Sequence, residues 1–193
     1  MKRLCVFCGS NVGARQVYRD AALALGKEMA RREIGLVYGA GNVGLMGVIA
    51  NAMLEVGGDV IGVIPEHLVV KEVEHRGLTE LRVVKTMHER KALMADLASG
   101  FIALPGGFGT YDEFCEIVTW AQLGLHQKPC GMLNVAGFFD AMLAMFDHAT
   151  QEGFIRPDHR AMLRVASDTH ALLDEMETYR APVVEKWITR SDV

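Results

Sequence analysis

The sequence predicts an α/β protein with a Rossmann-like open sheet, mainly parallel, that carries helices on both faces. Short apolar runs rich in β-forming residues alternate with longer segments of helical periodicity, which is the pattern of βαβ units. Most of the apolar runs are continuous rather than alternating, as expected for strands that are covered on both faces. Glycine-rich loops follow the first, second and fifth runs, and in open parallel sheets such loops bind ligands.

The elements follow one another without a linker or an internal repeat, so we expect a single Rossmann-like domain over residues 1–193. Strands are predicted at residues 4–8, 36–38, 60–64, 81–84, 101–104 and 130–135, with a last strand-like piece at 163–166. Helices are predicted at residues 17–32, 45–56, 87–98, 110–123, 138–151 and 169–179. This alternation predicts a mainly parallel sheet.

The composition is that of a folded protein with a single site. The 193 residues are 50% hydrophobic and 23% charged, and the net charge of -4 gives no bulk attraction to nucleic acid or anionic lipid. The apolar run at the N-terminus is broken at Gly9, and no segment approaches the ~20 apolar residues that span a bilayer. We therefore expect a cytoplasmic protein with neither a nucleic acid nor a membrane partner.

Cys5 and Cys8 form a CxxC pair, which occurs in redox and zinc sites. Residues three apart in a strand point to opposite faces, and no second pair completes a metal shell. We expect these two thiols, Cys115 and Cys130 to be reduced and mostly buried, and we expect no metal site. No histidine has a nucleophile or a partner histidine at a recognisable spacing, so all seven are interpreted as non-catalytic.

The loop PGGFGTYDE, residues 105–113, has the features of a phosphate cradle. Its glycines let the backbone approach a ligand closely, and the helix that follows offers the positive end of its dipole. Thr110 and Glu113 also match a capping box, whose only role would be to satisfy donors at the helix end. Capping leaves Gly106, Gly107 and Gly109 unexplained, so the combination favours a ligand site.

The loop GAGNVG, residues 39–44, matches the dinucleotide fingerprint, and Glu66 lies where an acid that binds ribose would be. A lone match of this kind is weak evidence. None of the four tyrosines has a lysine four residues later, as short-chain reductases need, and no substrate domain follows. The sequence therefore disfavours nicotinamide chemistry.

Arg90 and Lys91 open the helix that follows the fourth strand. A charge cluster of this kind is by default a solvated helix face. The end of that strand should lie close to the PGGFGT loop, where an arginine could hold a phosphate or carboxylate with two donors. Met46, Met87 and Met94 fall at helical spacing, which is more typical of a core or a subunit interface than of ligand contacts.

The motifs taken together resemble the LONELY GUY (LOG) family, from about residue 4 to residue 155. They are VFCGS at 6–10, LVYGAGNVGLMG at 36–47, VIGVIP at 60–65, MHERK at 87–91, ALPGGFGTYDE at 103–113 and TWAQLGLHQKPCGMLNV at 119–135. The resemblance implies hydrolysis of the N-glycosidic bond of an N6-substituted adenosine 5′-monophosphate, which releases the free cytokinin base and ribose 5-phosphate. Adenosine monophosphate (AMP) would often be accepted as well. It further implies a homodimer with the pocket near the subunit interface, and neither a metal nor an organic cofactor.

The same resemblance implies residue roles. Arg90 and Glu113 would be the catalytic pair. The phosphate would be held by Gly106, Gly107, Gly109 and Thr110, and the nucleotide would be lined by Ser10, Gly41, Glu72, Met87, Lys91 and Thr119. The chain departs from the commonest family pattern at Ala40 and Asn42, where the family tends to have Gly and Ser, at Asn11, and at Tyr111 and Asp112. These departures leave the preferred base open.

We expect Glu113 to stabilise the positive charge that develops on the ribose ring as the base leaves. Arg90 would hold the sugar-phosphate and keep that carboxylate ionised at neutral pH. The alternative from another class is a non-catalytic carrier of a nucleotide or of the molybdenum cofactor. Such a carrier has a similar fold and would need the cradle but not Glu113.

Overall fold

The structure is a computed structural model that describes residues 1–69 and 77–182. Its strands are β1 (Arg3–Phe7), β2 (Gly35–Tyr38), β3 (Val60–Pro65), β4 (Glu80–Val84), β5 (Gly100–Ala103), β6 (Cys130–Leu133) and β7 (Leu163–Ala166). Its helices are α1 (Gln16–Arg31), α2 (Gly44–Leu54), α3 (Glu66–Val69), α4 (Met87–Leu97), α5 (Phe108–Gln122), α6 (Asp140–Gln151), α7 (Pro157–Arg160) and α8 (Thr169–Glu177), with a 3-10 turn, η1 (Val135–Gly137). Every strand and long helix that the sequence predicted is present.

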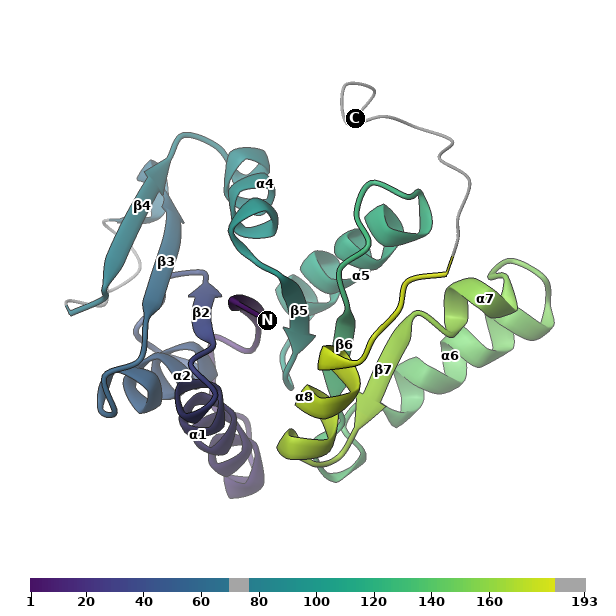
Figure 1. The fold of residues 1–193 in the computed structure, drawn as a ribbon, viewed down its shortest axis with the longest axis horizontal. Coiled ribbons are helices and arrows are strands. Elements are labelled where there is room, and N and C mark those ends of the chain that lie inside the picture. The colour runs from purple at the N-terminus through teal and green to yellow at the C-terminus, as the bar shows by residue number, and fades with distance from the viewer. Residues whose placement is uncertain (70–76, 183–193) are drawn as a thin grey trace.

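Within the described residues the strands form one seven-stranded sheet in the order β4-β3-β2-β1-β5-β6-β7, with β4 and β7 at the two edges (Figure 1). All neighbouring strands pair in parallel, which confirms the predicted topology. The direction of the strand order reverses between β1 and β5, where Phe7 pairs with Ala103. The loops that follow these two strands therefore begin side by side, at the switch point where open α/β sheets bind ligands.

Side chains from the central strands alternate between two hydrophobic cores, one on each face of the sheet. Leu4 and Val6 of β1 pack with α1, α2 and α8, whereas Cys5 and Phe7 pack with α4 and α5. Cys8 belongs to the first core, so the two thiols of the CxxC pair lie on opposite faces. All four cysteines are free, and the redox or zinc interpretation of the pair is excluded by this geometry.

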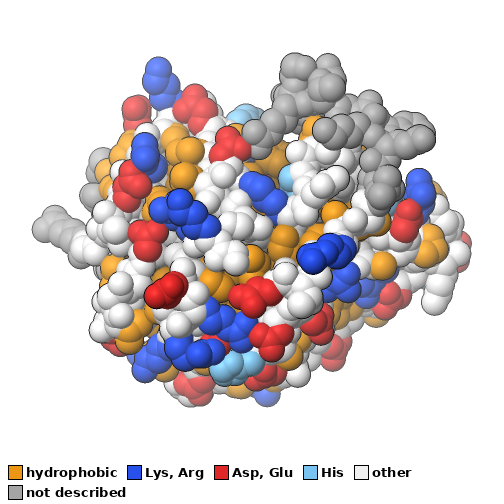
Figure 2. Space-filling view, viewed as in Figure 1, with side chains coloured by type: hydrophobic (Ala, Val, Ile, Leu, Met, Phe, Trp, Pro, Cys, Tyr) orange, Lys and Arg blue, Asp and Glu red, His pale blue; other side chains and the backbone are white. Residues whose placement is uncertain are grey.

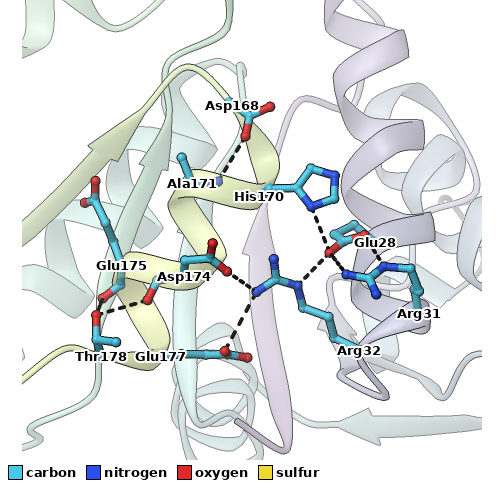
Figure 3. Close-up of polar contacts among 10 residues, drawn as sticks. All are labelled: Glu28, Arg31, Arg32, Asp168, His170, Ala171, Asp174, Glu175, Glu177 and Thr178. Carbon is cyan, nitrogen blue, oxygen red and sulfur yellow. Dashed lines mark hydrogen bonds and ion pairs between the residues drawn. The ribbon is translucent and has the colours of Figure 1, made fainter.

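An ion-pair network ties α8 to the end of α1 (Figure 3). The buried carboxylate of Glu28 accepts hydrogen bonds from Arg31 and Arg32, and His170 Nδ1 lies 3.1 Å from it. Arg32 also donates to Asp174 on α8, at 2.6 Å. The hydrogen bonds from Arg31 and then Arg32 outweigh the effect of burial and lower the pKa of Glu28 from 4.5 to about 2. Since α1 ends just before β2 begins, this network lies at the opposite edge of the sheet from the switch point.

The surface carries both signs of charge. Acidic and basic side chains lie interspersed on the face shown in Figure 2, in keeping with the small net charge of -4. In the part of the chain that the structure describes, no helix combines the length and the apolar composition needed to cross a membrane.

Candidate active site

A cavity of about 240 Å³ lies beyond the carboxyl ends of β1 and β5, at the switch point. It brings together several residues that the sequence singled out: Ser10, Arg90, Gly107, Gly109, Thr110 and Glu113. Residues from β1, from the loop after β2, from α4 and from the start of α5 all reach it. The glycine-rich loops after β1, β2 and β5 thus converge on one edge of the sheet.

The loop after β5 leaves space that the fold itself does not use. Its first part is tightly packed, since Gly9 N–H donates to the Pro105 oxygen at 3.0 Å and a Cβ atom on Gly106 would overlap the Thr110 hydroxyl. A Cβ atom on Gly107 or Gly109, by contrast, would meet nothing within 4 Å. The fold tolerates side chains at these two positions, so their absence indicates room kept for a ligand.

Helix α5 begins at Phe108, with Gly107 as its N-cap and no side-chain capping bond. The N–H group of Tyr111 donates to the Gly107 oxygen at 3.1 Å, so the N–H groups of residues 108–110 precede the helical ladder. Free N–H groups and a helix dipole at a cavity wall favour an anion. Since Thr110 is already the third helical residue, it is not an N-cap, and the capping-box interpretation of Thr110 and Glu113 is wrong.

The guanidinium of Arg90 is buried and held by the backbone of two strands. Its Nε donates to the Val63 oxygen at 3.1 Å and its Nη2 to the Gly39 oxygen at 2.9 Å, while Nη1 lies 3.8 Å from Met87 Sδ. These contacts use three of the five N–H groups of the side chain, which leaves two for a ligand in the cavity. A Cβ atom on Gly39 would overlap Nη2, so a glycine is required there for Arg90 to reach the strand.

Glu113 shares the cavity with Arg90, and its pKa is raised above the usual 4.5. Burial is the largest cause, because it disfavours the charged carboxylate, and Asp112 and Glu116 act in the same direction. The positive charges of Arg90 and Lys91 lower the pKa but do not outweigh burial. Arg90 thus lowers the pKa of Glu113, as expected. The overall shift nevertheless brings the pKa of Glu113 closer to neutral pH, where a group transfers protons most efficiently.

Lys91 lies outside this cavity, in the groove between α4 and α5. Its Nζ forms ion pairs with Glu116 at 3.0 Å and Asp112 at 3.4 Å. Burial lowers the pKa of Lys91, but these two carboxylates outweigh it and the pKa is raised. The lysine lines a separate cavity of about 590 Å³ whose walls include Phe101 and Trp120. The structure therefore places Lys91 apart from Arg90 and Glu113.

The remaining predicted residues take different places. Gly106 lines an adjoining cavity of about 200 Å³, and Gly41 is buried within its loop, outside the residues that line the 240 Å³ cavity. Thr119 is exposed and its hydroxyl donates to the Cys115 oxygen at 2.8 Å. Met87 touches Arg90, and Glu72 lies outside the described residues.

Sequence reasoning missed several residues that line the cavity: Cys8, Gly9, Gly39, Met46, Met94 and Phe108. Phe108 and Gly39 stand inside the two glycine-rich motifs, which is the signal that could have identified them. The side chain of Cys8 is buried beside the site, and burial together with the charge of Glu113 raises the pKa of its thiol. This thiol is therefore neutral and is not a nucleophile.

The GAGNVG loop supports the first loop instead of offering a second phosphate site. The N–H of Leu45, at the start of α2, donates to the Gly9 oxygen at 3.0 Å, and a Cβ atom on Gly44 would overlap the backbone of Ser10. The end of α2 that would bind a pyrophosphate is thus packed against the β1 loop. In the same loop Ala40 has φ 63°, a left-handed conformation that glycine adopts at lower cost than alanine.

Comparison with known proteins agrees with the motifs. The family described as "Possible lysine decarboxylase" matches residues 46–176. A probable cytokinin riboside 5′-monophosphate phosphoribohydrolase of Oryza sativa subsp. japonica is 52% identical over 92% of this chain and 79% of its own. A cytokinin riboside 5′-monophosphate phosphoribohydrolase of Arabidopsis thaliana is 48% identical over 92% of this chain and 84% of its own.

A solved structure, the molybdenum cofactor carrier protein of Chlamydomonas reinhardtii, is similar at a TM-score of 0.70 with 19% sequence identity, covering 91% of this chain and 96% of that one. At this identity the likeness concerns the fold alone. The curated relatives share about half of their residues with this chain over most of its length. The chain accordingly belongs to the LOG family of cytokinin riboside 5′-monophosphate phosphoribohydrolases.

Proposed function

We propose that the chain hydrolyses the N-glycosidic bond of N6-substituted adenosine 5′-monophosphates, releasing the cytokinin base and ribose 5-phosphate. The observation that carries the proposal is the presence of Arg90 and Glu113 in one cavity at the N-terminus of α5. The relatives in Oryza sativa and Arabidopsis thaliana, which are named for this reaction and this substrate class, support the proposal. No step of the reaction calls on a metal or an organic cofactor.

The phosphate would bind at the start of α5. Gly107, Gly109 and Thr110 line the cavity there, and the empty space beside both glycines fits an anion in contact with the backbone. The two remaining N–H groups of Arg90 would hold the phosphate or a ribose hydroxyl, because the rest of the guanidinium is fixed by strand carbonyls. Ser10, which also lines the cavity, would complete the polar shell.

Glu113 would act at the sugar. As the bond between the anomeric carbon and the base nitrogen breaks, positive charge develops on the ribose ring, and a buried carboxylate stabilises it more than it stabilises the substrate. Water then adds its oxygen to the anomeric carbon and passes one proton to Glu113, and the base, which departs as an anion, takes up the proton that Glu113 returns. The raised pKa of Glu113 suits a group that accepts and returns a proton in one cycle.

The carrier alternative has weaker support. The likeness to the molybdenum cofactor carrier protein is at 19% identity, whereas the phosphoribohydrolases are about 50% identical. A carrier also has no use for the carboxylate of Glu113 in the cavity that would hold the phosphate, since this carboxylate would repel an anionic ligand. The acid in the phosphate site is thus better explained by catalysis.

Three finer points belong to the same proposal. AMP would be accepted, because the cavity groups bind the sugar-phosphate that all these nucleotides share.

The chain would form a homodimer through the groove between α4 and α5, whose apolar cavity of about 590 Å³ is unusual for a solvent-facing surface. It would act in the cytoplasm, since its four cysteines are free and cytoplasmic thiols are kept reduced.

The test is to incubate the purified protein with isopentenyladenosine monophosphate, with AMP and with the unphosphorylated riboside, and to follow free base and ribose 5-phosphate by chromatography. We expect free base from the two monophosphates only. Glu113→Gln should abolish release, whereas Glu116→Gln, a matched change one turn along α5, should keep turnover within a few fold. Intact nucleotide after binding to the parent protein would favour the carrier.

A further inference from the structure

Phe108 is an aromatic side chain that the fold leaves uncovered. Its side chain is 93% exposed, although it stands in the middle of the glycine-rich loop and lines the cavity that holds Arg90 and Glu113. Gly107 and Gly109 flank it, and the space at both positions is open. Exposing a phenyl ring to water is unfavourable, and packing does not explain it here.

The size of the cavity suggests what would cover the ring. A volume of about 240 Å³ lies below the roughly 300–1,000 Å³ of pockets that enclose a whole ligand of drug size. The polar groups inside it, which are Arg90, Glu113 and the start of α5, match a sugar-phosphate. A nucleotide bound in this way must leave its base at the mouth of the cavity, and Phe108 is the large apolar group exposed there.

Building on the proposed function, we propose that Phe108 is the residue on which the nucleobase packs, with the phenyl ring against the face of the base. Every base has a π face, so this contact gives affinity for purine nucleotides in general and does not choose among N6 substituents. The ring therefore explains how a small polar cavity holds a ligand whose larger half lies outside it.

The contact between Phe108 and the base also predicts which kinetic constant the side chain affects. The base is still planar and still in place when the glycosidic bond breaks, so packing on Phe108 stabilises substrate and transition state alike. Losing the ring should raise KM and leave kcat near the parental value. This pattern separates a residue that binds the base from Glu113, whose loss should act on kcat.

The experiment compares Phe108→Ala, Phe108→Leu and Phe108→Tyr with Phe154→Ala. Phe154 is the matched control, because it is 86% exposed and lies outside the cavity. Dissociation constants are measured by calorimetry in the Glu113→Gln background, which should not cleave AMP, for AMP and, separately, for ribose 5-phosphate, which lacks the base. KM and kcat are measured for AMP, and the oligomeric state by light scattering.

We expect Phe108→Ala to weaken AMP binding and raise KM about tenfold, in line with the loss of one base-aromatic contact. Affinity for ribose 5-phosphate should not change, Phe108→Tyr should restore the parental values, and Phe108→Leu should fall between them. Phe154→Ala should behave as the parent. Binding constants do not require turnover, so this result can be read even if the parent releases no base and the proposed function fails.

Two outcomes would overturn the inference. Equal losses of affinity for AMP and ribose 5-phosphate would mean that Phe108 shapes the phosphate cradle and does not meet the base. A change in oligomeric state with unchanged affinity for AMP would assign the ring to a contact between copies of the chain.

Discussion

Nη2 of Arg90 lies 2.9 Å from the backbone oxygen of Gly39, at the carboxyl end of β2. Together with the bond from Nε to the Val63 oxygen, this contact fixes the plane of the guanidinium against two neighbouring strands. The orientation of the Arg90 guanidinium is therefore set by these backbone carbonyls, and not by Glu113 or a ligand. A residue oriented in this way is in place before the substrate arrives.

Gly39→Ala should disable the site without replacing either Arg90 or Glu113. The added methyl group would overlap Nη2 and push the guanidinium out of its plane. A hydrogen bond to a charged group contributes about 1.5–3 kcal/mol, so we expect kcat/KM to fall by roughly 10–100-fold. Arg90→Lys should cause a similar loss, because an ammonium group cannot span both carbonyls. Parental kcat/KM in Gly39→Ala would show that the arginine acts independently of this contact.

Gly109→Ala should separate stability from activity. Gly109 lies in the first turn of α5 and its Cβ position is empty, so alanine there should raise stability by up to about 1 kcal/mol. The methyl group would fill the space assigned to the phosphate and weaken nucleotide binding. Thermal melting and KM for AMP, measured on the same preparation, test the expected gain in stability and the expected loss of affinity. An unchanged KM would place the phosphate elsewhere.

Glu113→Gln should stabilise the protein at neutral pH. The folded-state pKa of this carboxyl is raised above 4.5, so it contributes stability below that value and loses it as the pH rises through the folded pKa. The neutral amide avoids this loss. We expect a higher melting temperature than the parent at neutral pH and no difference below pH 4.5. A lower melting temperature at neutral pH would mean that the carboxylate is stabilised by its neighbours.

Glu28→Gln should have the opposite dependence on pH. The folded-state pKa of Glu28 is lowered from 4.5 to about 2, so its contribution is complete above pH 4.5 and is lost as the pH falls toward 2. We expect the variant to lose about 1–3 kcal/mol at neutral pH and to match the parent near pH 2. The exposed Glu33, changed to Gln, is the control at the same end of α1. Urea unfolding across this range measures the difference.

The regular elements could be predicted because each carries its own pattern. β3 is a continuous apolar run that ends in proline, and α5 has apolar residues at helical spacing, so the predicted bounds agree with the structure to within about two residues. The helices α3 and α7 have four residues each and were missed, because one turn is too short to show periodicity. Pro157 at the start of α7 is the one local signal for it.

The site was predictable where one loop carries it and not where distant segments meet. The glycines of the PGGFGT loop predict a phosphate site. The position of Arg90 after the fourth strand predicts that its side chain lies close to that loop. The carbonyls that hold Arg90 belong to Val63 in β3 and to Gly39, the residue that follows β2, and naming them requires the order of strands in the sheet. The pairing of Lys91 with Glu116 depends on how two helices lie against each other, which no spacing within either helix reveals.

The raised pKa of Glu113 also bears on how this fold evolves. A partly buried carboxylate that destabilises the folded chain at neutral pH is kept only while selection favours turnover, because replacing it increases the free energy of unfolding. The proposed phosphate site at the start of α5 does not depend on Glu113 and would be retained after Glu113 is replaced. Replacing Glu113 alone would thus convert the enzyme into a protein that binds nucleotides without cleaving them. Such a substitution would also increase stability at neutral pH, so selection for stability would not oppose it.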